Sequence, residues 1–178
     1  MHTALMVAVA LAALGAAGSA RAQTDKPFLH PLFTDNAVLQ RDTPVNVWGW
    51  TKPGETVSVR VADRSASGVA GPDGKWTVRL KPVKAGGPFQ MTVSGAQTVT
   101  LRNVMYGDVW VGGGQSNMEM AVLSVKNAAQ EIAAADYPNI RLYDVPNTIA
   151  LEPLDTVSAE WKECSPKTVG PFSASLFF

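Results

Sequence analysis

Short apolar runs separated by turn residues fill the first half of the sequence and limit its fold more than any other feature. Between Phe28 and about Asn103 these runs alternate apolar with polar residues and recur at spacings of about ten residues. Such alternation is typical of strands that bury one face, and no helical period occurs in the segment. We therefore predict a small β-sandwich of immunoglobulin or jelly-roll type over residues 28–103.

Turn chemistry separates the expected strands. Pro53-Gly54 and Asp73-Gly74 combine residues that fix φ or favour a bend with a glycine that accepts a positive φ. In the run that follows the first turn, every valine falls on one face. The strands predicted from these patterns are 38–40, 45–50, 56–61, 76–80, 89–93 and 97–101.

The pattern changes near Tyr106. Residues 108–111 form a nearly continuous apolar run, as expected of a strand buried on both faces of a parallel sheet. Apolar residues then recur at helical spacing between Met120 and Ala133, residues 140–145 resemble a second strand, and residues 172–178 resemble the opening of another helix. This order predicts a β-α-β unit. We expect residues 104–178 to be the N-terminal part of a three-layer α/β domain, so that the fold class is α/β plus β.

Charge and cysteine content exclude several classes of function. The sequence has 15 basic and 15 acidic residues and no Lys/Arg cluster, so it carries no electrostatic footprint for nucleic acid or an anionic membrane. Cys164 is the only cysteine, which excludes an internal disulfide and a cysteine-rich metal site. A lone thiol without a nearby histidine is expected to be a small buried apolar residue.

The first 22 residues resemble a signal peptide. An Ala-rich apolar stretch ends in Ala20-Arg21-Ala22, which has the small-x-small form of a cleavage site. The segment before the stretch contains His2 but no Lys or Arg, which is atypical. We predict cleavage after Ala22 and a secreted or periplasmic protein, with no membrane association after cleavage.

A glycine-rich motif marks the place where chemistry is expected. Gly112-Gly113-Gly114-Gln115-Ser116-Asn117 lies between the predicted buried strand and the predicted helix. Alpha/beta enzymes place nucleophiles at this position, and unpaired N–H groups of a first helical turn can donate to an oxyanion. We expect the glycines to let the backbone turn sharply. A serine hydroxyl at this position still needs an adjacent base.

The motif allows two other interpretations. A phosphate-binding loop is disfavoured because no Gly-Lys-Ser/Thr follows and because Asn117 stands where a dinucleotide-binding loop needs glycine. A structural role remains open, since Ser116 and Asn117 are both good helix N-caps.

A longer block resembles a known family. The sequence Tyr-Gly-Asp-Val-Trp-Val-Gly-Gly-Gly-Gln-Ser-Asn-Met-Glu at 106–119 resembles the block that opens the catalytic domain of sialate O-acetylesterases, which are SGNH-type hydrolases. The likeness extends to the sandwich and downstream. The segments that carry it are 35–41, 47–50, 53–55, 73–76, 86–88, 161–166 and 172–174.

The resemblance implies a carbohydrate O-acetylesterase that uses no metal or cofactor. Ser116 would be its nucleophile and would contribute a backbone N–H to the oxyanion hole, while Gly114, Gln115 and Asn117 would support the loop. The substrate would be an O-acetylated sialic acid or a related sugar; the sequence indicates neither the acetylated hydroxyl nor the oligomeric state.

The family places its Asp-x-x-His acid and base downstream of the nucleophile, and no histidine follows Ser116. We therefore expect an N-terminal fragment that is inactive alone. The alternative is a non-catalytic carbohydrate-binding or structural β-module, in which Trp48, Trp50 or Trp76 would stack on sugar rings, although tryptophans in such strands more often lie in the core.

Overall fold

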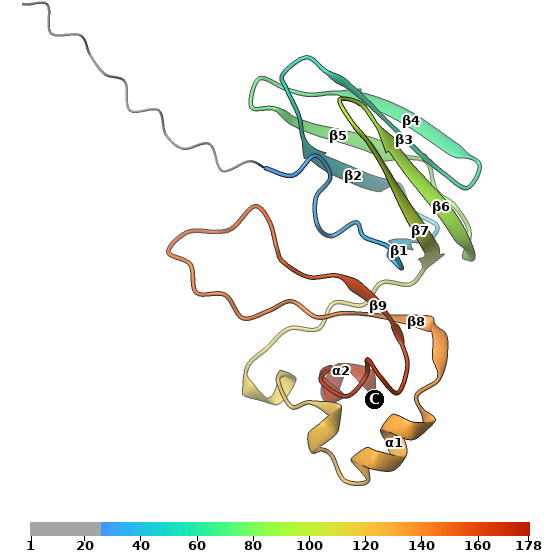
Figure 1. Ribbon diagram of the computed structural model, residues 1–178, viewed down its shortest axis with the longest axis vertical. Helices are drawn as coiled ribbons and strands as arrows, with labels where there is room; N and C mark the ends of the chain where they lie inside the picture. Colours follow the sequence, from blue (N-terminus) through green and yellow to red (C-terminus); the bar gives the residue numbers. More distant parts are fainter. Residues whose placement is uncertain (1–25) are drawn as a thin grey trace, which may run out of the picture.

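The computed structural model describes residues 26–178, so the predicted signal peptide at 1–22 lies outside the described residues. The chain forms a β-sandwich followed by a smaller part that contains two paired strands and short helices, with the two parts in contact (Figure 1). Within residues 26–178, no helix is long and apolar enough to cross a membrane.

The sandwich consists of a five-stranded and a two-stranded sheet. The larger sheet has the order β1-β7-β6-β3-β4, with β1 parallel to β7 and the remaining pairs antiparallel. The smaller sheet pairs β2 with β5 antiparallel. The strand bounds are β1 Val38–Gln40, β2 Val45–Trp50, β3 Thr56–Val61, β4 Arg64–Val69, β5 Lys75–Leu80, β6 Gly86–Ser94 and β7 Thr98–Gly107.

The sandwich core lies between the two sheets and follows the predicted alternation. All three valines of β3 are fully buried, as are the alternate residues Trp76, Val78 and Leu80 of β5. The Trp76 indole Nε1–H donates to the Phe28 carbonyl at 2.9 Å, so the one polar atom of this buried side chain is satisfied. The expected strands and the shared valine face are thus present.

The sequence pattern missed one strand of the sandwich and the end of another. β4 has the sequence Arg-Ser-Ala-Ser-Gly-Val, without apolar alternation, because it lies at the sheet edge with every side chain at least partly exposed. Its turn from β3 places Ala62 at φ 51° instead of using the glycine or asparagine typical of such turns. β7 runs to Gly107, beyond the predicted limit of 103.

One tyrosine at the end of β7 is buried without a hydrogen-bond partner. Tyr106 is almost fully buried, its hydroxyl contacts no acceptor or donor among the described residues, and burial raises its pKa to about 12. A buried hydroxyl without a partner costs about 1–3 kcal/mol of desolvation.

We expect Tyr106→Phe to raise the free energy of unfolding by about 1 kcal/mol, because it removes this unsatisfied hydroxyl. Tyr143→Phe is the control and should lower the free energy, since its hydroxyl donates to the Pro31 carbonyl at 3.3 Å. Urea titrations would measure both. Because the Tyr106 pKa is raised, the wild type should also lose stability relative to Tyr106→Phe as the pH rises from 10 toward 12. Equal destabilisation by both changes would contradict the assignment.

The predicted β-α-β unit is not formed in residues 104–178. Residues 108–114 have no regular secondary structure, so the strand predicted at 108–111 is absent. The helix predicted between Met120 and Ala133 is divided into two short ones, η2 Val122–Ser124 and α1 Ala128–Ala134, and a further short helix, η1 Ser116–Met118, precedes them. The predicted strand 140–145 corresponds to β8 Tyr137–Tyr143, which pairs antiparallel with β9 Trp161–Cys164. A two-faced parallel strand needs neighbours on both edges and cover on both faces, and none are present around 108–111.

A small second core holds the C-terminal part together. Its buried residues include Cys164, whose thiol pKa is raised by burial, which confirms the expectation of a small buried apolar residue. The last helix, α2 Ala174–Phe177, begins near the predicted position. The cluster consists of Val122, Ala135, Leu142, Cys164, Val169, Phe172 and Ala174.

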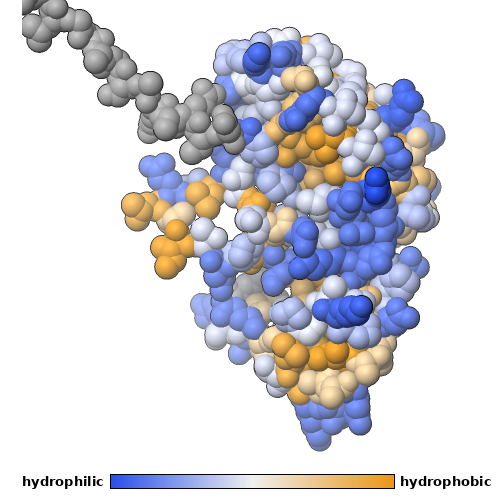
Figure 2. Space-filling view, viewed as in Figure 1, coloured by the Kyte–Doolittle hydropathy of each residue, from blue (hydrophilic) through white to orange (hydrophobic). Residues whose placement is uncertain are grey.

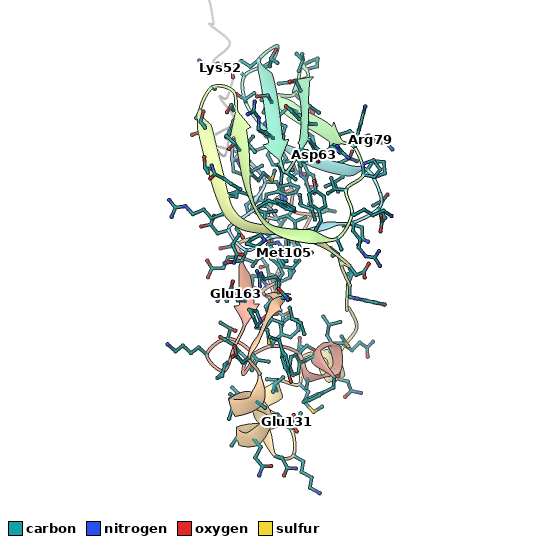
Figure 3. All side chains as sticks on the ribbon, turned by 90° about the vertical axis from the view of Figure 1, so that its right-hand side faces the viewer. Lys52, Asp63, Arg79, Met105, Glu131 and Glu163 are labelled. Carbon is teal, nitrogen blue, oxygen red and sulfur yellow. The ribbon has the colours of Figure 1, made fainter. Side chains whose placement is uncertain are left out.

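Polar contacts join the sandwich to the β8–β9 pair. The Asn103 side-chain amide donates to Asn36 Oδ1 at 2.8 Å and to Glu163 Oε1 at 2.5 Å, and its oxygen accepts from Arg141 Nη2 at 3.1 Å. The Trp161 indole donates to the Leu32 carbonyl, on the sandwich side, at 2.9 Å. Glu163 lies at this junction, just below the end of the sandwich (Figure 3). The sandwich therefore positions β8 and β9 directly.

Candidate active site

The glycine-rich segment connects the sandwich to the short helix η1. None of Gly112, Gly113 and Gly114 has a positive φ, so the expected sharp glycine turn is not present. Two of them instead permit close packing: a Cβ on Gly112 would lie 2.9 Å from Leu176 Cδ1, and one on Gly114 would lie 2.8 Å from Met118 Cγ. A Cβ on Gly113 would meet nothing within 4 Å. Gly114 therefore supports the loop by making room for Met118.

Ser116 is the first residue of η1 and is exposed to solvent. Its hydroxyl forms no hydrogen bond with any described residue, and neither its backbone N–H nor that of Asn117 has an acceptor in this part of the chain. Its carbonyl accepts from the Glu119 N–H at 3.1 Å. The arrangement leaves one exposed hydroxyl beside two N–H groups that have no acceptor among the described residues, and N–H groups of this kind can donate to an oxyanion.

The loop around Ser116 is fixed by contacts with the C-terminal residues. The Gln115 carbonyl accepts from the Met118 N–H at 2.8 Å, and the Asn117 carbonyl accepts from Ser175 Oγ at 2.9 Å. Asn147 donates its side-chain amide to Glu119 Oε1 at 2.8 Å. Sequence reasoning did not find Ser175 or Asn147, because no local pattern links them to the motif. The side chains of Gln115 and Asn117 make no hydrogen bonds to described residues, so their support of the loop comes from the backbone.

Comparison with known proteins gives a consistent result. No family model matches the chain. Sialate O-acetylesterase from Rattus norvegicus is 34% identical over 155 residues, which are 78% of this chain and 29% of that protein. Sialate O-acetylesterase from Homo sapiens is 32% identical over 154 residues, again 78% of this chain and 29% of that protein. This chain is related to the sialate O-acetylesterases.

A solved structure supports the same relationship. The crystal structure of a carbohydrate acetylesterase from Xanthomonas citri is 37% identical, with a TM-score of 0.80 over 84% of this chain and 35% of that chain. The chain thus spans less than a third of the length of the curated sialate O-acetylesterases and about a third of the solved enzyme.

His30 is the only histidine among the described residues of this chain, and its contacts keep it away from a catalytic role. His30 accepts from the Leu32 N–H at Nδ1, at 3.0 Å, which places its proton on Nε2, 2.9 Å from the Asp155 carbonyl. The ring packs against Trp48 and Trp50. Burial lowers its pKa, with the Lys75 charge acting in the same direction. Both ring nitrogens are used, so His30 is a structural residue that ties the sandwich entrance to residues 144–160.

This arrangement predicts how stability depends on pH. The folded-state pKa of His30 lies below its ordinary value of 6.5, so the unfolded chain takes up a proton first as the pH falls. Folding stability should therefore decline as the pH is lowered below 6.5. In His30→Gln the decline should be shallower, which urea midpoints at pH 7.5 and pH 5.5 would measure. Identical slopes for wild type and variant would show that His30 is not the titrating group.

Proposed function

We propose that the chain supplies the nucleophile of a serine carbohydrate esterase that removes O-acetyl groups from sialic acid or related sugars. Ser116 Oγ attacks the acetyl carbonyl carbon, and the bond from that carbon to the sugar oxygen breaks. The sugar hydroxyl leaves with a proton, and water then releases acetate from the acetyl-serine. In this scheme the N–H groups of Ser116 and Asn117 donate to the oxyanion.

One observation carries this proposal: Ser116 is exposed in a loop fixed from several sides, beside two N–H groups without acceptors. A helix N-cap uses its side-chain oxygen to accept a backbone N–H. Neither Gln115, which occupies the cap position of η1, nor Ser116 makes such a bond with described residues. The structural interpretation of Ser116 as a cap is therefore disfavoured. The names of the related proteins support the acetyl-ester substrate class.

The proposed reaction also needs a general base, which His30 does not supply. The Asp-x-x-His that the resemblance implies would have to come from polypeptide other than residues 26–178. In this proposal, the described residues alone are inactive. Export to the periplasm or the cell exterior is part of the same proposal and follows only from the signal-like segment.

The non-catalytic alternative is weakened by the positions of its tryptophans. Trp76 is fully buried, Trp50 is buried, and Trp48 packs against the sandwich core and Phe33. Trp50 and Trp76 therefore occupy the core, as expected for tryptophans in such strands, while the half-buried Trp48 is packed against it.

Acetate release from O-acetylated sialic acid tests the substrate class. The chain would be combined with the part of the Xanthomonas citri acetylesterase outside the matched region, and the Ser116→Ala variant would be assayed beside it. We expect Ser116-dependent acetate release, faster from the acetylated sugar than from ethyl acetate. Ser116-dependent hydrolysis of both esters at equal rates would retain the nucleophile and reject the sugar.

A further inference from the structure

The two N–H groups proposed to donate to the oxyanion belong to peptide groups that are fixed at their carbonyl ends. A peptide group is planar, so the carbonyl of one residue and the N–H of the next are held in opposite directions within one rigid unit. The Gln115 carbonyl accepts from the Met118 N–H at 2.8 Å, which fixes the N–H of Ser116. The Ser116 carbonyl accepts from the Glu119 N–H at 3.1 Å, which fixes the N–H of Asn117. The direction of the Asn117 N–H therefore depends on the position of Glu119.

The side chain of Glu119 is bound by a residue far along the chain. Asn147 donates its side-chain amide to Glu119 Oε1 at 2.8 Å, across a separation of 28 residues. Within residues 26–178, Glu119 forms no other side-chain hydrogen bond or ion pair. Because Glu119 is exposed to solvent, no packing of its side chain replaces this contact. Asn147 is thus the residue that holds Glu119 in place.

Asn147 lies on the loop of residues 144–160, which connects β8 to β9 and projects from the body of the molecule (Figure 1). Figure 2 shows apolar residues on this projecting loop, in contact with solvent. Two of them, Ile149 and Leu151, are fully exposed. Apolar packing therefore does not determine where this part of the loop lies, and its polar contacts do.

The far end of the same loop is anchored to the sandwich. The Asp155 carboxylate pairs with Lys26 Nζ at 2.6 Å, and the Asp155 carbonyl accepts from His30 Nε2 at 2.9 Å. The loop is therefore held at Asp155 by the sandwich and reaches Glu119 through Asn147.

We propose that Glu119 is a positioning residue of the esterase site: bound by Asn147, it holds the Ser116 carbonyl and so directs the Asn117 N–H toward the oxyanion, a role that rests on the proposed function. Hydrogen-bond donors stabilise a developing oxyanion most when they are already oriented toward it. The carboxylate acts here as a hydrogen-bond acceptor, since a negative charge does not itself favour a nearby oxyanion. An uncharged acceptor of the same length should therefore replace it.

Hydrogen exchange of the full chain tests the contact without an assay of activity. Asn147→Ala removes the donor, so the Met118 and Glu119 amides should exchange about fivefold faster, the effect of losing one hydrogen bond of ordinary strength. Asn139→Ala is the matched control, because Asn139 is exposed on β8 and its side chain makes no hydrogen bond to a described residue. It should leave both amides unchanged. Equal exchange in the wild type and Asn147→Ala would overturn the positioning role.

Acetate release separates positioning from a purely structural contact. In the chain combined with the remaining Xanthomonas citri polypeptide, Glu119→Ala should lower kcat about tenfold and leave KM nearly unchanged, because the misdirected N–H group acts in the transition state. Glu119→Gln keeps an acceptor for Asn147 and should restore kcat to about the wild-type value. Glu152→Ala removes an exposed carboxylate from the 144–160 loop and should change neither constant.

Failure of this role differs from failure of the proposed function. A Ser116-dependent rate that Glu119→Ala leaves unchanged would show that the contact with Asn147 is only structural. Equal loss of kcat in Glu119→Gln and Glu119→Ala would show that the charge matters and would overturn the role as a hydrogen-bond acceptor. Acetate release that does not depend on Ser116 would instead reject the nucleophile, and with it the role of Glu119 in catalysis.

Discussion

Purified chain should hydrolyse 4-nitrophenyl acetate at the same rate as its Ser116→Ala variant. The reason is that a serine hydroxyl is a weak nucleophile until a base removes its proton, and the ring nitrogens of His30 are both occupied. When the base is supplied by the remaining acetylesterase polypeptide, the same substitution should lower turnover by about a million-fold, or about 8 kcal/mol. Ser116→Ala should therefore lower the rate greatly when the remaining polypeptide is present and should have no effect on the rate of the chain alone.

Ser67→Ala is the matched control for this assay, since Ser67 is an exposed serine on β4 of the sandwich. It should leave both rates unchanged. Release of nitrophenol by the chain alone that disappears in Ser116→Ala and persists in His30→Gln would mean that some other group within the chain, or a second copy, acts as the base. Loss of that release in both variants would assign the base to His30 and would contradict its structural role.

The second large effect concerns the sandwich core. Trp76→Ala should lower the free energy of unfolding by about 3–5 kcal/mol, because it opens a cavity at a fully buried site. Domains are typically stable by only about 5–15 kcal/mol, so the variant should be close to unfolding. Trp110→Ala removes an equally large side chain from an 83% exposed position and should change stability by less than about 0.5 kcal/mol.

Urea unfolding followed by far-UV circular dichroism would measure both variants without relying on tryptophan fluorescence. Trp76→Phe is an intermediate case that keeps a ring in the core and loses the hydrogen bond to the Phe28 carbonyl. Its cost should fall between the other two. A Trp110→Ala variant as unstable as Trp76→Ala would show that residues 110–114 are buried in solution.

The sandwich could be predicted from sequence because the alternation of apolar and polar residues in its strands indicates which face is buried. Val57, Val59 and Val61 alternate with polar residues, and the sheet buries that face and no other. β4 could not be found in this way, since an edge strand with no fully buried side chain has no apolar period. Its existence depends on pairing with β3, which is information that the six residues of β4 do not contain.

The same distinction between local pattern and long-range pairing applies to the candidate site. The motif around Ser116 stood out through its family resemblance, while residue types alone left a structural role open; its catalytic role stays a prediction, and the structure shows an exposed Ser116 in a fixed loop. The strand predicted at 108–111 was wrong for the described structure because apolar residues indicate only that burial is favourable. Whether burial occurs depends on neighbouring strands. The contacts of Ser175 and Asn147 could not be predicted from the sequence for a similar reason, since each joins distant parts of the chain.

The contacts between the sandwich and the β8–β9 pair have a consequence for the order of folding. The two strands are separated by residues 144–160, so closing them into a hairpin costs more chain entropy than closing a tight turn. Asn103 and the carbonyl that receives the Trp161 indole belong to the sandwich side and are available once that side has folded. We therefore expect the sandwich to act as a template on which β8 and β9 are brought together, so that the N-terminal half of the chain guides assembly of the half that contains the loop contacts of Ser116.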